Sequence, residues 1–512
     1  MADRIMLEFG PWEPDAALLN GVQAPEACNV IPEKRGYRPV PGMNTGKYDA
    51  LPGAAMEVFS SKDMADTMST LAATADGIYA LEWDEDADKL AWALHYTVEP
   101  VTSARYFTQY GDAIYALYGN TLLKQAAAGT NFEPVDTASG YDYDAPAGAV
   151  LGTIRDFLVI GRLDSNPGAI QWSGIDRPDV WPTPGTNAAQ YIQSDIQVFP
   201  VGGKVMSIVG AVGGVDGLIF MERAIHRATY VGPPYIMQFD AVDWQQGTIA
   251  AKSPVVCGTM CFYLSEDGWK MTDGAGVRPI GNGRVDRWFF SQCDPDRVRE
   301  VRGVHDSAHR MAVWSFPTTG APAGTHDLLL IYSYTLDKWS YAQCSVECLF
   351  SDYSRGLSLE ELDALMPQAV PVEDGGIDTP KPPRPFDSLD SDALKNGMRI
   401  LGCVDTAHKM GSFSGSPMQA VIETAEHGGA RMMVHGFRPL VDCGNAQARP
   451  IWRTVQRNQR SYGNYTTQSR RDGICYQHLS CDYVAAGVLI PEGEEWHHAV
   501  AVEGVIEEEG GL

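Results

Sequence analysis

The stretch from Asp216 to Phe290 alternates short apolar runs with turns. An Asp-Gly pair between two such runs, in SEDGW at 265–269, is a strong hairpin signal, because both central residues of a type I′ turn need positive φ. We therefore expect Ser265 to Gly268 to form the turn, and small antiparallel hairpins to be the building unit. The runs are LIFM at 218–221, YIMQF at 235–239 and MCFYL at 260–264.

The same unit recurs earlier in the chain. Most of its copies are spaced close to the roughly 40 to 45 residues that a four-stranded propeller blade needs, and the widest gap indicates a loop insertion. The pattern predicts a mainly β chain with a β-propeller over residues 61–350, and a large irregular β-sandwich is the alternative. The copies are DGIYAL at 76–81, GDAIYALYGN at 111–120, RDFLVIG at 155–161 and DGLIFM at 216–221.

Three further segments flank or follow this region. Residues 1–60 show little periodicity and many Pro, Gly and Asn, which predicts an extended N-terminal arm that joins the C-terminal domain, since it has no core of its own. Residues 351–397 combine a short helical pattern, LEELDALM, with an acidic Pro-rich stretch, which predicts a linker or loop. Residues 398–512 return to β patterning and predict a second β domain.

The balance of charge restricts the partners of the chain. Its 512 residues contain 39 Lys and Arg against 65 Asp and Glu, a formal net charge of −26. Phosphate binding depends on Lys and Arg that displace counterions, so we do not expect this surface to wrap nucleic acid. An acidic wall would instead let DNA slide past without adhering. No apolar run of about 18 residues and no N-terminal apolar segment occurs, so we expect no membrane span and no signal peptide.

Motifs for catalysis or metal binding are hard to find. The ten cysteines form no C-x-x-C pair and are expected as free thiols. In GSFSG at 411–415, Phe413 occupies the position that a nucleophile elbow gives to serine. No H-E-x-x-H and no glycine-rich dinucleotide turn is present. We predict no catalytic, cofactor or metal site, although carboxylates from distant blades can still converge.

One segment of the C-terminal domain is basic in this otherwise acidic chain. RPIWRTVQRNQRSYGNYTTQSRR contains no acidic residue before Asp472. It is a candidate docking surface for an acidic partner or for phosphate, and a solvated hairpin tip is the alternative. Its arginines are Arg449, Arg453, Arg457, Arg460, Arg470 and Arg471.

Taken in order, several segments resemble the tail nozzle, or tail-hub, proteins of short-tailed bacteriophages, including the P22-type packaged-DNA stabilisation proteins. The similarity spans nearly the whole chain and lies in the order of loose motifs. These are EFGPWEPD and NVIPEKRGYRPVPG near the N-terminus, IQWSGIDRPDVWP, FYLSEDGWK, IGNGRVDRWFF and the closing IPEGEEWHHAVAVEGVIEEEGG.

The resemblance implies a β-propeller with an additional β-sandwich-like platform domain and no enzymatic activity. It implies a ring, usually a homohexamer, stacked below the adaptor ring on the portal of the virion and assembled in the host cytoplasm. Such a ring extends the tail tube, helps to retain the packaged genome, attaches fibres or a tip, and conducts double-stranded DNA during ejection without reading its sequence. We expect acidic side chains to outnumber basic ones on the channel-facing surface.

Two other classes of protein compete with this interpretation. A virion-associated propeller that binds or degrades host-surface glycans needs convergent carboxylates or exposed aromatic side chains on one face. Trp172 and Trp181, on either side of an Asp-Arg-Pro-Asp turn, either cap a blade edge or form a sugar-stacking platform. A cellular propeller scaffold that binds peptides is the third class.

Overall fold

The computed structural model describes residues 3–17, 21–84, 89–97, 105–135, 144–354, 397–454 and 459–508. Within these ranges the chain is mainly β, as the sequence predicts. The helices described are short: α2 (Asn187–Ile192), α3 (Asp286–Gln292) and the 3-10 helix η1 (Val298–Glu300). None of the described helices has the length and apolar character needed to cross a membrane.

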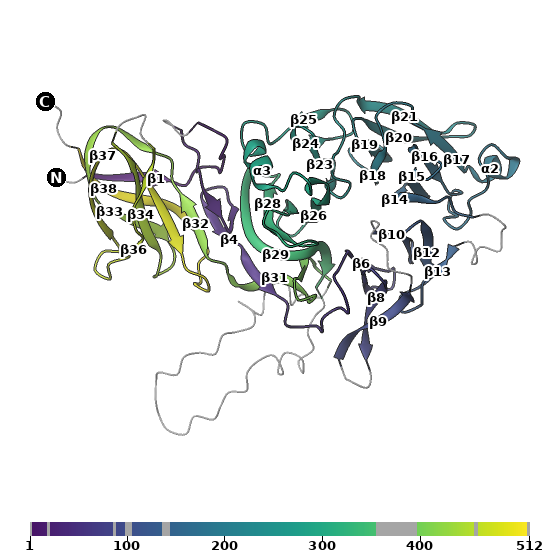
Figure 1. The fold of residues 1–512 in the computed structure, drawn as a ribbon, viewed down its shortest axis with the longest axis horizontal. Coiled ribbons are helices and arrows are strands. Elements are labelled where there is room, and N and C mark those ends of the chain that lie inside the picture. The colour runs from purple at the N-terminus through teal and green to yellow at the C-terminus, as the bar shows by residue number, and fades with distance from the viewer. Residues whose placement is uncertain are drawn as a thin grey trace, which may run out of the picture.

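Five four-stranded antiparallel sheets follow one another along the chain and along an arc in Figure 1. Each is built from consecutive strands, as expected from repeated hairpins. The first contains β6 (Glu57–Lys62), β7 (Met68–Ala73), β8 (Gly77–Asp84) and β9 (Lys89–Thr97), and the second β10 (Arg105–Tyr110), β11 (Ala113–Tyr118), β12 (Thr121–Gln125) and β13 (Glu133–Pro134). The third contains β14 (Gly148–Ile154), β15 (Phe157–Leu163), β16 (Asn166–Trp172) and β17 (Asp195–Val198). The fourth contains β18 (Val205–Val209), β19 (Gly217–Met221), β20 (Ile225–Gly232) and β21 (Ile236–Asp243), and the fifth β22 (Val255–Cys257), β23 (Met260–Ser265), β24 (Gly268–Thr272) and β25 (Val277–Pro279).

A sixth group of consecutive antiparallel strands ends the arc. It contains β26 (Arg302–Asp306), β27 (Met311–Phe316), β28 (His326–Ser333) and the long β29 (Lys338–Tyr353). This group contacts the first sheet, because Ser60 Oγ of β6 donates a 2.6 Å hydrogen bond to Asp352 of β29, and the amide of Ala55 donates a 2.9 Å bond to Glu347. The two ends of the arc therefore meet.

The turn at residues 265–268 lies where the sequence predicts it, but its type differs. Ser265 pairs with Gly268 in the antiparallel register, so Glu266 and Asp267 are the central residues of the turn. Neither has positive φ; Gly268 takes φ +134° instead. Glycine is required here for a second reason, since a Cβ would lie 2.2 Å from Asp286 Oδ2. The turn is thus not type I′, and the glycine accommodates the approach of α3.

Most of the remaining strands form a lobe from both ends of the chain, at the left of Figure 1, whereas β30 pairs with β29 and β31 lies below β29 in the picture. Strand β1 pairs antiparallel with β38, and β2 pairs with β32, so the predicted arm supplies strands to the C-terminal domain. Of the predicted linker, residues 351–353 belong to β29 and residues 355–396 lie outside the described residues. From the N-terminal side come β1 (Asp3–Glu8), β2 (Ala27–Cys28), β3 (Val30–Pro32), β4 (Tyr37–Pro39) and β5 (Pro41–Asn44). From the C-terminal side come β30 (Arg399–Asp405), β31 (Met410–Pro417), β32 (Ala420–Glu423), β33 (His427–Val441), β34 (Gln447–Arg453), β35 (Ser461–Tyr462), β36 (Thr466–Thr467), β37 (Cys475–Ile490) and β38 (Ala499–Glu508).

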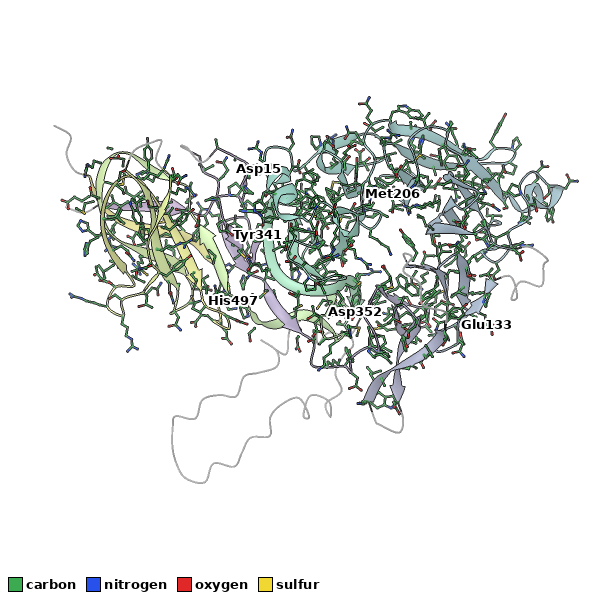
Figure 2. The ribbon with its side chains drawn as sticks, viewed as in Figure 1. Asp15, Glu133, Met206, Tyr341, Asp352 and His497 are labelled. Carbon is green, nitrogen blue, oxygen red and sulfur yellow. The ribbon has the colours of Figure 1, made fainter. Side chains whose placement is uncertain are left out.

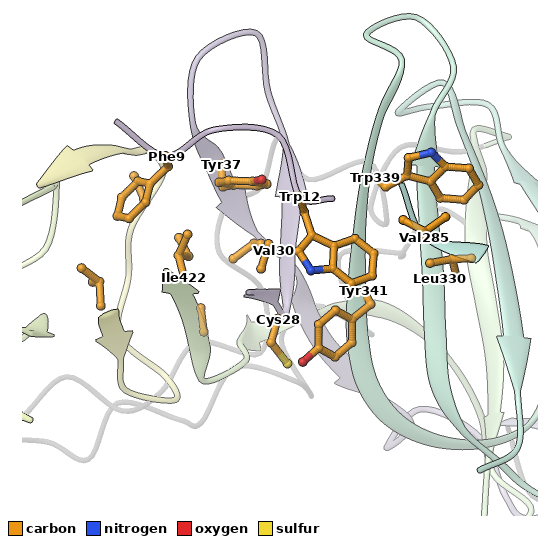
Figure 3. Close-up of a cluster of buried hydrophobic side chains, with 14 of the residues drawn as sticks. Phe9, Trp12, Cys28, Val30, Tyr37, Val285, Leu330, Trp339, Tyr341 and Ile422 are labelled. Atoms are coloured by element: carbon orange, nitrogen blue, oxygen red, sulfur yellow. The ribbon is translucent and has the colours of Figure 1, made fainter. Parts of the chain in front are cut away.

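One large hydrophobic cluster runs through the arm, the last two groups of the arc and the C-terminal lobe. Figure 3 shows part of it, with Trp12 of the arm next to Tyr341 of β29 and, on the lobe side, Ile422 of β32. Smaller clusters join neighbouring sheets of the arc; for example, Phe220 of β19 meets Tyr263 of β23 with ring centroids 4.9 Å apart. The arm is therefore part of the core, not a tail on its surface.

Candidate functional site

The arm contacts the fifth and sixth groups of strands through an aromatic anchor. The Trp12 side chain is only 1% exposed. Its ring centroid lies 4.7 Å from that of Trp288 in an edge-to-face arrangement. It lies 5.2 Å from that of Tyr341, which is its neighbour in Figure 3. Aromatic pairs at these distances stabilise beyond the burial of their area. Trp12 thus fixes the arm between helix α3 and strand β29.

Polar contacts beside Trp12 complete this connection. Asp15 accepts two hydrogen bonds from the first turn of α3, at 2.6 Å from the amide of Arg287 and at 2.9 Å from that of Trp288. The N-cap residue of α3, Val285, provides no side-chain hydrogen bond of its own, so the arm supplies the acceptor that the exposed helix amides need. Glu13 forms a 2.9 Å ion pair with Arg284. We call the contact of Trp12, Glu13 and Asp15 with residues 284–288 and Tyr341 the arm junction.

A second contact ties the arm to the end of the chain. Tyr37 of β4 pairs with Ala499 of β38, and its hydroxyl donates a 2.7 Å hydrogen bond to the carbonyl of Gly10. Glu33 lies 3.0 Å from His498 Nδ1. Four of the segments that carry the family resemblance therefore meet in pairs: EFGPWEPD with IGNGRVDRWFF, and NVIPEKRGYRPVPG with the closing segment. Sequence reasoning missed these contacts because the partners are hundreds of residues apart.

A polar cluster lies where several sheets of the arc meet. Glu57 of β6 forms ion pairs with Lys252 at 2.7 Å and with Arg302 of β26 at 3.0 Å, and the Lys252 ammonium lies 4.0 Å from the ring centroid of Tyr106 of β10. Burial lowers the pKa of Lys252 and raises that of Tyr106 to about 12. We call these four residues the central cluster. They connect the first, second and sixth groups of strands with the segment that precedes the fifth.

The chemistry available to the central cluster is limited. Its single carboxylate is shared between two cations, so its charge is already compensated. Glycoside hydrolysis normally uses two carboxyl groups that flank the scissile bond, and this cluster contains one. No group of three or more His, Cys, Asp or Glu side chains suited to a metal ion occurs in the part of the chain that the structure describes. The arrangement fits a role in holding sheets together.

The structure describes five of the six candidate docking arginines and does not bring these five together on one free surface. Arg449 pairs with Glu423 at 3.0 Å, Arg460 pairs with Glu426 at 2.7 Å, and Arg453 also binds Glu426. These three are mostly buried and hold the lobe together, so they form neither the free docking surface nor the solvated tip considered from sequence. A docking role stays a prediction for Arg470 and Arg471, which are exposed, while Arg457 lies outside the described residues.

Comparisons with known proteins identify no family. No protein-family model and no curated protein matches the chain. Among solved structures, an extracellular domain of a two-component system protein from B. thetaiotaomicron is 11% identical, with 85% of this chain and 47% of that chain covered and a TM-score of 0.29. An ancestral GH74 enzyme is 10% identical, with 76% and 58% covered and a TM-score of 0.32. An exo-β-1,3-galactanase from Phanerochaete chrysosporium is 9% identical, with 84% and 99% covered and a TM-score of 0.25.

The first of these proteins is about twice as long as the part that this chain matches. At such low TM-scores the likeness carries no argument about activity. The functional interpretation therefore depends on the chain itself, that is, on the arm junction, the central cluster and the charge.

Proposed function

We propose that this protein is a structural subunit of the tail nozzle of a short-tailed bacteriophage, which helps to retain packaged DNA and conducts it during ejection. In this proposal the six groups of strands form a closed six-bladed β-propeller, and the arm with the C-terminal lobe forms a β-sandwich-like platform. The contact of the first sheet with β29 and the central cluster support the closed ring of blades. The subunits assemble into a ring, a hexamer by the family expectation, between the adaptor and the fibres or tip.

The observation that carries the proposal is the arm junction. The segments that resemble nozzle proteins are the ones that connect the two β parts, through Trp12 and Asp15 on one side and the Glu33–His498 contact on the other. A ring closes only when each subunit presents its two interfaces at a fixed angle. A junction made of buried aromatic and capped helical contacts supplies that fixed angle.

The charge of the chain supports the same function. Each subunit carries a net charge of −26, and the arginines at 449, 453 and 460 are used internally by Glu423 and Glu426. A ring of such subunits repels the phosphate backbone on average, because acidic side chains outnumber basic ones in each subunit. DNA then passes through the lumen without being held at one position.

A glycan-degrading propeller is less well supported. Trp172 and Trp181, the candidate sugar-stacking pair, are each only 2% exposed, and their indole nitrogens donate to the carbonyls of Gln193 and Pro178. They stabilise the third sheet and its connection, so the interpretation as a stacking platform is wrong. The central cluster, with one compensated carboxylate, lacks the pair of carboxyl groups that hydrolysis requires.

Assembly of the purified full-length chain tests the proposal. Negative-stain images and mass photometry should show closed rings with a central channel, and the protein should bind capsids that carry portal and adaptor but lack the distal tail. Capsids completed in this way should retain more DNA than untreated ones. A protein that stays monomeric at micromolar concentration, does not bind such capsids and releases sugars from host-surface polysaccharide would refute the proposal in favour of the enzyme.

A further inference from the structure

A polar pocket opens where the arm, the sixth group of strands and the C-terminal lobe meet. Its volume is about 610 Å³, within the range of small-molecule sites. Tyr341 of β29, which lies between the arc and the lobe in Figure 2, forms part of its wall. The other residues used below come from the arm and the lobe: Glu26, Glu423, Arg449, Arg460 and Tyr462.

The pocket contains hydrogen-bonding groups that the protein does not fully use. Arg449 Nε and Arg460 Nη2 are buried and have no hydrogen-bond partner among the described residues, although other atoms of both side chains contact Glu423. Buried donors of this kind are normally satisfied, so these two unpaired donors show that the arginines in the pocket wall keep hydrogen-bonding capacity that Glu423 and Glu426 do not use. Glu26 accepts a hydrogen bond from the Tyr341 hydroxyl, and burial raises its pKa to about 7. Near neutral pH this carboxyl can therefore donate as well as accept.

An exposed aromatic ring lies at the same place. Tyr462 is 51% exposed, and the Arg449 guanidinium lies 4.9 Å from its ring centroid and 4.7 Å from that of Tyr465. Arg449 therefore holds the Tyr462 ring in position from one side, while much of the ring stays open to solvent. A preordered, exposed aromatic surface suits an apolar face of a sugar ring, which carries C–H groups and loses little entropy on stacking.

The balance of charge in and behind the pocket selects against anions. Arg449, Arg453 and Arg460 are matched by Glu423 and Glu426, and Glu26 adds a further, partly ionised carboxyl. The site is close to neutral overall and rich in paired donors and acceptors. A phosphate or a DNA backbone would meet carboxylates at hydrogen-bond distance from the arginines, whereas hydroxyl groups can donate to the carboxylates and accept from the arginines at once.

We propose that this pocket binds a neutral saccharide, with Tyr462 stacking against the sugar ring and Arg449, Arg460 and Glu26 hydrogen-bonding its hydroxyl groups. This adds a sugar-binding function to the chain. It does not depend on the nozzle proposal, because the pocket lies within one subunit. Sugar binding and ring formation can therefore succeed or fail separately.

Saturation-transfer NMR on the intact purified protein tests this site. The probes are methyl β-D-galactopyranoside, methyl α-D-glucopyranoside and N-acetyl-D-glucosamine, with inorganic phosphate as a competing anion. We expect transfer to at least one sugar, no displacement by equimolar phosphate, and binding at least tenfold weaker in Tyr462→Ala. Tyr462→Phe should keep most of the binding, because it keeps the stacking ring.

Tyr476→Ala is the matched control, since Tyr476 is 52% exposed in the same lobe and its hydroxyl bonds to Asp472 outside the pocket. It should bind sugar as the unmodified chain does. Absence of transfer to all three sugars, displacement of the sugar by phosphate, or equal losses in the two tyrosine-to-alanine variants would each overturn the proposal. Both tyrosines are exposed, so neither variant is expected to unfold the lobe.

Discussion

Replacing Trp12 by alanine should release the arm from the junction without unfolding the rest of the chain. The indole is almost fully buried against Trp288 and Tyr341, so the substitution leaves a cavity that the rigid neighbours cannot fill. Truncating a buried tryptophan to alanine typically costs about 3–5 kcal/mol. Because the lost contacts are those between the arm and the sixth group of strands, the cost should appear in the local opening of the arm.

This cost can be converted into a measurable change. Each 1.4 kcal/mol changes an equilibrium constant tenfold, so the opening constant of the arm should rise by roughly a hundredfold to a few thousandfold. The amides that report it are Ala24, which donates to the carbonyl of Pro11 at 2.8 Å, and Asn29, which donates to that of Tyr341 at 2.8 Å. Hydrogen exchange followed by mass spectrometry of peptides that cover residues 22–32 measures their protection.

Trp83→Ala is the control, because Trp83 is 52% exposed at the end of β8. The same substitution of tryptophan by alanine should therefore cost far less stability there. Protection of residues 22–32 should fall in Trp12→Ala and stay unchanged in Trp83→Ala. Equal protection in both variants would refute the reasoning that Trp12 holds the arm. Loss of protection throughout the first five sheets in Trp12→Ala would show that the junction does not open as a separate unit.

Three further changes follow from the structure. Gly268→Ala should lower the free energy of unfolding, measured by urea denaturation, by about 2 kcal/mol, because φ is +134° and the new Cβ would meet Asp286. Gly276→Ala is the control and should be nearly neutral, because its Cβ would meet nothing within 4 Å. Burial raises the pKa of Asp286 to about 6, so its folded form holds a proton that the unfolded form releases, and stability should fall as pH rises from about 4 to 6. Melting temperatures measured across this pH range should fall less in Asp286→Asn than in the unmodified chain. An unchanged dependence of melting temperature on pH would contradict the role given to Asp286. Glu57→Gln should cost about 3 kcal/mol by leaving its two cationic partners uncompensated, as measured by thermal unfolding.

The repeated hairpins were predictable because they depend on local information. Apolar runs with turn residues between them identify strands that pair with their immediate neighbours, and the five sheets of consecutive strands have this arrangement. The turn at 265–268 was placed correctly from Asp267 and Gly268. The prediction of a type I′ turn was wrong. Gly268 adopts its conformation where Asp286 of α3 approaches it, and the local sequence pattern contains no information about this contact.

The arm shows the opposite case. Its segment lacks periodicity because its short strands pair with β29, β32 and β38, whose positions the tertiary fold decides. The sequence predicted that the arm joins the C-terminal domain, since the arm has no core of its own. Asp15 binds amides of α3 that are more than 270 residues away in the chain. The sequence shows only an acidic residue near an aromatic one, which does not predict these partners.

The arginine-rich segment shows why charge counted along a sequence is a weak guide to a surface. Between positions 449 and 471 the chain has only basic charges, which predicts a free cationic patch. The acids that compensate it, Glu423 and Glu426, stand before the segment, and strand pairing in the lobe brings them to Arg449 and Arg460. What remains in the pocket is a nearly neutral set of paired charges beside Tyr462, a surface that recognises hydroxyl groups better than phosphate. The position of Glu423 and Glu426 thus decides between a cationic docking site and a saccharide site, and only the fold shows that position.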